Sequence, residues 1–359
     1  MGADLVDWEL ATSTGRRLAR PGPVLSRAEA DGIVSELRRL AGEAEEHVGD
    51  YTQLIPGSEI AAQSPVAVVD RPEWIRANVA GLQAMSDPML RKLDTTQSSG
   101  RLSRTAGRRI SGVQVGGLLA YLSNKVLGQY EVFGADETGA DLPAGGRLLL
   151  VAPNIADLER RLDVPHRDFR LWVCLHEQTH RLQFTAVPWL RGHLESELAK
   201  FAEVTDLDPQ ALASRAKAAI GAARKRETTS IVEMLQTPEQ RVVLDRLQAI
   251  MTLLEGHADQ VMDAVGPAVV PSVELIRQRF ERRRDGGSAL DRVVRKLLGL
   301  DLKMQQYRQG GAFVREVVEH VGVRGFNTVW ESPQTLPTRA ELAAPEAWLT
   351  RVLGLTPAA

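Results

Sequence analysis

A histidine-glutamate-histidine pattern inside an apolar segment constrains this chain more than any other feature. His176, Glu177 and His180 form the sequence H-E-x-x-H, and hydrophobic residues flank it from Phe169 to Phe184. Helical residues four apart lie one above the other, so both imidazoles face one side. That spacing suits two bonds of about 2.0–2.1 Å to one Zn²⁺, with Glu177 near enough to deprotonate a water on the metal. We therefore predict a zinc site with two histidine ligands and a general base.

The alternative interpretation of the pattern is an exposed polar pair on an amphipathic helix. The helix that should begin near Asp163-Val164-Pro165 is, however, apolar nearly all round, which predicts a buried and central position. Buried histidines and a buried glutamate are costly unless something satisfies them, and a metal would do so. Cys174 is the single cysteine, and we expect it to be a buried, inert thiol.

A catalytic zinc needs a third protein ligand and an open position for water. The metzincin pattern would require glycine at position 183 and histidine at position 186, whereas the chain has Gln183 and Ala186, so that class is excluded. The gluzincin arrangement instead takes a glutamate from a later helix. Glu255 and Asp259 fit it, because they are four apart in an otherwise apolar helical segment. We predict Glu255 as the third ligand and Asp259 as the group that orients His176; the alternative is an exposed acidic pair.

Other candidates for the third ligand fit less well. His257 is two residues from Glu255 and therefore points about 200° away from it around the helix. Glu195 and Glu197 follow the motif, but neither is followed by an acid four residues later.

Composition and pattern predict a mainly α protein with a small β-sheet. Hydrophobic residues make up 43% of the 359 residues, as in ordinary globular proteins. We expect a helical region over 1–110 and a metal-binding region with a helical C-terminal part over 111–359, packed as one compact unit. Strands are predicted over 130–133 and 147–151, and a flexible link over 94–109. The strands either lie beside the H-E-x-x-H helix, where one could pair with an extended substrate, or form a small hairpin over the core. Helices are expected from 26, 70, 112–127, 163, 188–204, 209–226, 237–265, 273–284, 288–298, 307–321 and 348–353.

Charge and the N-terminal sequence bear on partners and location. The formal net charge is −2, which argues against nucleic acid or an anionic membrane as a partner. The first residues include early acids and no apolar run typical of a signal peptide, and no uncharged apolar stretch of membrane-spanning length occurs. We expect a cytoplasmic protein.

The chain also resembles a known family, the zincin-like zinc-dependent hydrolases of actinobacteria, some of which are named for an association with deazaflavin coenzyme biosynthesis. The resemblance covers nearly the whole chain and is most specific at the two metal-site segments. It implies a zincin-like metallopeptidase fold and metal-dependent hydrolase activity, and it implies no particular substrate. The segments that carry it are Trp8 with 16–19, 71–75, 176–180, 254–259 and 325–330.

These observations lead to one functional hypothesis and one alternative. The first is a zinc hydrolase, most simply a peptidase acting on a peptide or protein, with zinc on His176, His180 and Glu255 and with Glu177 as general base. The alternative is a zincin-like scaffold whose metal is structural and which binds a partner protein, because the sequence identifies no oxyanion donor or specificity pocket. The sequence does not predict the oligomeric state.

Overall fold

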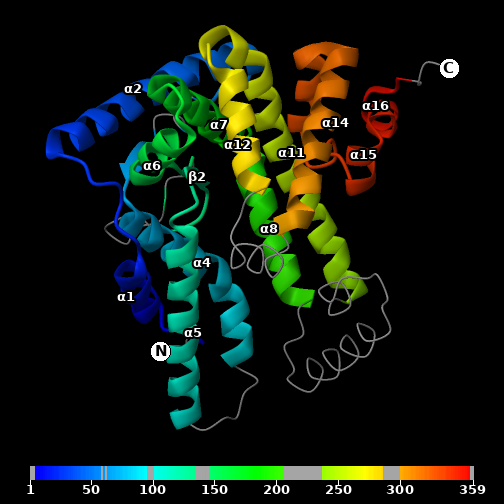
Figure 1. Ribbon diagram of the computed structural model, residues 1–359. Coiled ribbons are helices and arrows are strands. Elements are labelled where there is room, and N and C mark those ends of the chain that lie inside the picture. Colours follow the sequence, from blue (N-terminus) through cyan, green and yellow to red (C-terminus); the bar gives the residue numbers. More distant parts are fainter. Residues whose placement is uncertain are drawn as a thin grey trace.

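The protein is mostly helical, with one small sheet, which confirms the predicted fold class (Figure 1). The computed structural model describes residues 5–57, 60, 63–94, 101–134, 142, 145–204, 237–285 and 300–355. The helices are α1 (Trp8–Leu18), α2 (Arg27–Thr52), α4 (Arg71–Asp94), α5 (Arg101–Leu122), α6 (Ala152–Leu162), α7 (His166–Ala186), α8 (Pro188–Val204), α11 (Pro238–Val269), α12 (Val273–Asp285), α14 (Leu300–Phe326), α15 (Arg339–Ala343) and α16 (Pro345–Leu353), with a 3₁₀ helix η1 (Asn327–Trp330).

In the part of the chain that the structure describes, the sheet has three strands in the order β1-β3-β2. Strand β1 (Val66–Val69) pairs parallel to β3 (Arg147–Val151), and β2 (Gly128–Glu131) pairs antiparallel to it. Both predicted strands are present, although β2 begins two residues earlier than expected. The prediction missed β1, a four-residue apolar run between Pro65 and Asp70 that is too short to show a clear period.

Strand β3 is buried along its whole length and packs on both faces. Successive side chains of a strand point to opposite faces. Leu150 joins the core formed with α2, α6 and α7, whereas Leu149 and Val151 join the core formed with α1 and α4. The sheet is therefore covered by helices on both sides, which explains the continuous apolar sequence of β3.

Helix α7 is central, as its apolar sequence predicts. One side of it, including Phe169 and Leu175, packs with α2 and with the second half of α11. Its C-terminal end, including Phe184, packs in a second core with α8, α11 and α14. Because α7 contacts both cores and the sheet, its position is determined by burial on several sides.

Two predicted helix starts have complete capping boxes. The Ser26 hydroxyl accepts from the backbone N–H of Glu29, and the Thr237 hydroxyl accepts from that of Gln240. Helix α4 begins as predicted at Asp70, whose carboxylate accepts from the backbone N–H of Glu73 at 2.8 Å. Such side chains satisfy N–H groups that the first helical turn leaves without partners.

The predicted flexible link over 94–109 is wrong for its second half, because α5 already begins at Arg101. Its polar composition suggested a loop, yet these residues form the start of the helix, where the backbone oxygen of Arg108 accepts a hydrogen bond from the N–H of Asp7 at 3.1 Å. Gly116 allows α1 and α5 to touch: a Cβ there would lie 2.4 Å from the carbonyl oxygen of Ala11. Helix α6 was also missed, and α11 continues past Pro267 to Val269 instead of ending at Gly266-Pro267.

The remaining sequence predictions concern regions and location. The helices expected over 209–226 and 288–298 lie outside the described residues. The expected boundary between 110 and 111 falls within α5, and the division into two regions stays a prediction. Among the described helices, none combines the length and the apolar character needed to cross a bilayer.

Candidate metal centre

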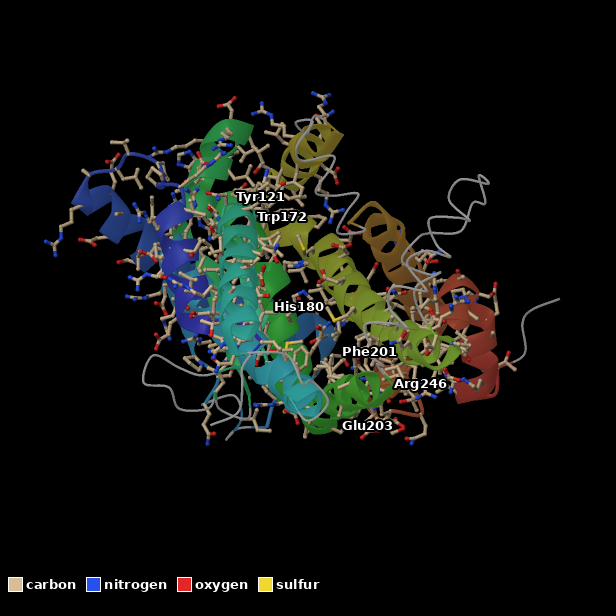
Figure 2. All side chains as sticks on the ribbon, turned by 90° about the horizontal axis from the view of Figure 1, so that it is seen from below. Tyr121, Trp172, His180, Phe201, Glu203 and Arg246 are labelled. Carbon is tan, nitrogen blue, oxygen red and sulfur yellow. The ribbon has the colours of Figure 1, made fainter. Side chains whose placement is uncertain are left out.

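Helix α7 places His176 and His180 side by side, as the four-residue spacing predicts. Their ring centroids are 4.8 Å apart, and their Nε2 atoms are 3.3 Å apart. Their side chains are 26% and 12% exposed, respectively, so both rings lie at the edge of the interior. Figure 2 shows His180 on α7 near the middle of the molecule, with α11 beside it. The two imidazoles are therefore turned toward a shared point that solvent can reach.

Glu255 on α11 completes this group. Its Oε2 lies 3.7 Å from Nε2 of His176 and 3.8 Å from Nε2 of His180. Among the described residues, His176, His180 and Glu255 are the side chains that could together hold a metal ion, with ligand atoms within 4.8 Å of one another. The structure thus brings together the three predicted ligands from two helices, although Glu255 lies 75 residues after His180 in sequence.

The distances within the group fit a zinc ion. Tetrahedral ligands about 2.0–2.1 Å from zinc lie about 3.3–3.4 Å from one another. The observed separations of 3.3, 3.7 and 3.8 Å differ from that by a few tenths of an ångström. Two imidazoles and one carboxylate also form the ligand set of known catalytic zinc sites with an open fourth position. The residues present fit zinc in both chemistry and spacing.

Glu177 lies against the first residue of β2. The residue is 6% exposed, and a Cβ added at Gly128 would lie 2.4 Å from its carboxyl carbon. Only glycine at the start of β2 leaves room for the Glu177 carboxylate in this position. Gly128 is thus a neighbour of Glu177 that the sequence prediction missed, and no sequence signal separates it from an ordinary strand-end glycine.

The electrostatics differ among the site residues. Burial, with the nearby His180, lowers the pKa of His176 to about 4. For His180, burial alone would lower the pKa, but the pairing with the negatively charged Glu255 carboxylate outweighs burial and raises the pKa to about 9. Burial raises the pKa of Glu177 to about 8, with a further contribution from the charge of Glu255. A neutral histidine and a carboxyl group that holds a proton near neutrality therefore share the site.

The second ring nitrogens of the two histidines have different partners. Nδ1 of His180 lies 2.9 Å from Oε1 of Gln183. Nδ1 of His176 lies 3.3 Å from the thioether sulfur of Met262. Asp259 is exposed on α11, one turn after Glu255, and its predicted role in orienting His176 stays a prediction. Neither Gln183 nor Met262 was predicted as a neighbour of the site. The Met262 contact depends on how α11 packs on α7, whereas Gln183 lies three residues after His180 on the same helix, a spacing that could have indicated it.

The competing ligand candidates lie in other environments. Glu195 pairs with Arg191 at 3.1 Å, and the buried Glu197 pairs with Lys200 at 2.7 Å. His257 is buried against the rings of Phe326 and Trp330, and burial lowers its pKa to about 3. Each is therefore engaged away from the three ligand atoms.

Cys174 is buried, as expected. Burial raises the pKa of its thiol above the ordinary value, so the group is held in the neutral form. A reactive or metal-binding role for this cysteine has no support in its surroundings.

Comparison with known proteins gives two matches over nearly the whole chain. A family model described as zincin-like metallopeptidase matches residues 6–349. A crystal structure from Chloroflexus aurantiacus, described as that of "a putative hydrolase with a novel fold", has 34% sequence identity and a TM-score of 0.68, and the match covers 96% of this chain and 98% of that one. No curated protein matches the sequence. The association with actinobacteria and with deazaflavin coenzyme biosynthesis stays a prediction. With the metal-site geometry and a family match that spans residues 6–349, the chain belongs to the zincin-like metallopeptidase family.

Proposed function

We propose that this protein is a zinc-dependent hydrolase, most simply a metallopeptidase, in which His176, His180 and Glu255 hold zinc and Glu177 is the general base. The observation that carries the proposal is the convergence of the three ligand atoms, 3.3–3.8 Å apart, from two separate helices. An exposed acidic or polar pair would have no reason to meet another helix at this spacing. Family membership and the hydrolase description of the similar structure support the same class of reaction.

The side chains have distinct roles in this proposal. Zinc bound by the two imidazoles and Glu255 would supply an activated water as nucleophile, because zinc lowers the pKa of water toward 7. The Glu177 carboxylate accepts a proton and later returns it to the leaving nitrogen of the amide. Its pKa of about 8 suits a group that must both take and give a proton near neutral pH.

The free edge of β2 supports a peptide or protein as the substrate. This strand is at the edge of the sheet and pairs with no second strand among the described residues. Its first residue, Gly128, lies against Glu177. An extended peptide that added to this edge would place its backbone beside the general base. The other interpretation, that the strands form a hairpin over the core, remains an alternative for the role of β2.

Zinc content is the first test. Protein purified without chelators should contain about one zinc per chain, bound in a site with three ligands. Glu255→Ala should lose the metal, because two imidazoles hold zinc far less tightly than three ligands do. A content well below half a zinc per chain in wild-type protein, with no gain after zinc is added, would contradict the proposal.

Digestion of a peptide library separates an enzyme from a scaffold. Wild-type protein should cleave peptides, whereas Glu177→Gln should retain zinc and lose about 10²–10⁴-fold in rate, the range typical of general acid-base catalysis. If wild type and Glu177→Gln bind zinc equally and neither cleaves any peptide, the scaffold with a structural metal becomes the preferred function. We retain the cytoplasm as the proposed location, with neither nucleic acid nor membrane as a partner.

A further inference from the structure

Gln183 connects the two helices that carry the metal ligands. It lies on α7 three residues after His180 and is fully buried. Its side-chain oxygen is 2.9 Å from Nδ1 of His180, and its side-chain nitrogen is 3.0 Å from the backbone oxygen of Leu254 and 3.0 Å from Nδ1 of His257. Leu254 immediately precedes Glu255. The Gln183 amide therefore contacts both His180, the proposed metal ligand on α7, and the residue next to Glu255, the proposed metal ligand on α11.

The partners of the amide determine its orientation. A backbone carbonyl only accepts hydrogen bonds, so the group of Gln183 that faces Leu254 must be the NH₂. The same NH₂ has a second proton for Nδ1 of His257, which accepts it. The side-chain oxygen then faces Nδ1 of His180, and this nitrogen must carry the proton. The orientation of the amide thus follows from its fixed backbone partner.

We propose that Gln183 is a positioning residue that holds His180 with its proton on Nδ1 and with Nε2 directed at His176 and Glu255. In this form, the lone pair of Nε2 is available to a metal. Ligand histidines commonly donate their other N–H to such an acceptor, which fixes the ring. The inference rests on the proposed metal site for its function, whereas the hydrogen bond itself exists without metal.

The two histidines differ in how firmly they are held. His176 has a thioether sulfur, a weak acceptor, 3.3 Å from its Nδ1. His180 has an amide oxygen at 2.9 Å, and that amide is itself held by two further hydrogen bonds. The hydrogen bond to Nδ1 therefore holds the ring of His180 in one orientation more firmly than the thioether contact holds the ring of His176.

The test compares two variants of Gln183 with a matched control on the same helix. Gln183→Met keeps the length of the side chain but removes the strong acceptor and both donors. Gln183→Glu keeps an oxygen for Nδ1 of His180. Gln178→Met is the control, because Gln178 is also buried on α7 but donates to the backbone oxygen of Ala41 at 2.8 Å and contacts neither histidine ring.

Zinc affinity is the first readout, measured by competition with a chromophoric chelator on the full chain. Gln183→Met should raise the Kd for zinc by about 10–100-fold, the usual effect of losing a partner of a ligand histidine. Gln183→Glu should recover most of that loss, and Gln178→Met should bind zinc as wild type does even if it is less stable. Equal zinc affinity in Gln183→Met and wild type, or equal losses in Gln183→Met and Gln178→Met, would overturn the inference.

The second readout is the Nδ1 proton of His180 in metal-free protein labelled with ¹⁵N-histidine, assigned with His180→Asn. A slowly exchanging ¹H–¹⁵N signal should be present in wild type, Gln183→Glu and Gln178→Met, and lost in Gln183→Met. Its absence in wild type contradicts the role of Gln183 directly. If the signal behaves as expected but wild type binds no zinc, the proposed function fails while the positioning of His180 by Gln183 stands.

Discussion

Helices α7 and α11 both carry proposed metal ligands, but they bring them to the site by different means. On α7, His176 and His180 face the same point because they are four residues apart on one helix. On α11, Glu255 reaches that point only because the whole helix lies at the right distance from α7. The relative position of the two histidines therefore follows from the local geometry of one helix, whereas the position of Glu255 follows from how α11 packs against α7.

Glycines set the position of α11. Gly256, directly after Glu255, lies against α14: a Cβ there would be 2.1 Å from the carbonyl carbon of Gly310. A Cβ at Gly310 would likewise be 2.1 Å from the backbone oxygen of Thr252. The helix backbones are therefore in direct contact one residue from the ligand, and α14 fixes α11 from the side opposite α7 (Figure 1).

Removing one ligand from each helix should have the largest effect. His180→Ala and Glu255→Ala should each weaken zinc binding by more than about a hundredfold, since loss of an outer partner alone costs about 10–100-fold. Chelator competition on both variants checks this. If only His180→Ala loses zinc, then α11 does not contribute a ligand, and the comparison between the helices fails.

Adding a methyl group between α11 and α14 should show how helix packing affects zinc binding while all three proposed ligands are kept. Gly256→Ala should lower the free energy of unfolding by about 1–3 kcal/mol, as overpacking does, and should also weaken zinc binding because Glu255 moves with its helix. Urea unfolding of metal-free protein and zinc titration measure the two effects. Gly311→Ala is the control: a Cβ there meets nothing within 4 Å, so stability should stay the same or rise. An unchanged Gly256→Ala variant would show that α11 tolerates displacement.

The contact between β2 and α7 can be altered without touching a ligand. Gly128→Ala should displace the Glu177 carboxylate, because the new Cβ would lie 2.4 Å from its carboxyl carbon. Displacing a catalytic group by about 1 Å can cost about a hundredfold in rate. We expect kcat for peptide cleavage to fall by about 10–100-fold while zinc content stays at the wild-type level. Gly117→Ala on α5, where a Cβ has no neighbour within 4 Å, is the matched control. Loss of zinc in Gly128→Ala would instead point to general disruption of α7.

Among these predictions, the change in zinc affinity for each unit of pH should be the smallest effect. Zinc binds neutral imidazole, and in metal-free protein the pairing with Glu255 holds the pKa of His180 at about 9, against the opposing effect of burial. Below that pH, zinc must displace one proton, so its affinity should rise about tenfold per pH unit as the pH increases toward 9. His176, with a pKa of about 4, adds no further dependence near neutrality. Calorimetry in buffers of different ionisation enthalpy counts the released protons, and a count near zero at neutral pH would exclude the His180–Glu255 pairing.

The sequence predicted the elements that depend on local rules. Capping residues Ser26 and Thr237 marked helix starts, and the apolar run of 147–151 marked the buried strand. The sequence prediction failed where no clear local pattern exists. The polar residues 101–109 form the start of α5, although the side chains described at 105–107 are exposed and show no apolar period, and the short strand β1 is recognisable only from its pairing with β3.

For the candidate site, the sequence by itself determined the two histidines and the base, because a helix fixes the geometry of residues i, i+1 and i+4. It also selected Glu255 by the rule that a third ligand comes from a later helix. Only the tertiary structure decided that Glu255 meets both histidines, that Gly128 leaves room for Glu177, and that Gln183 reaches the backbone oxygen of Leu254 on α11. Those contacts join segments distant in sequence, and their distances follow from how backbones and buried side chains fit together, which no local spacing encodes.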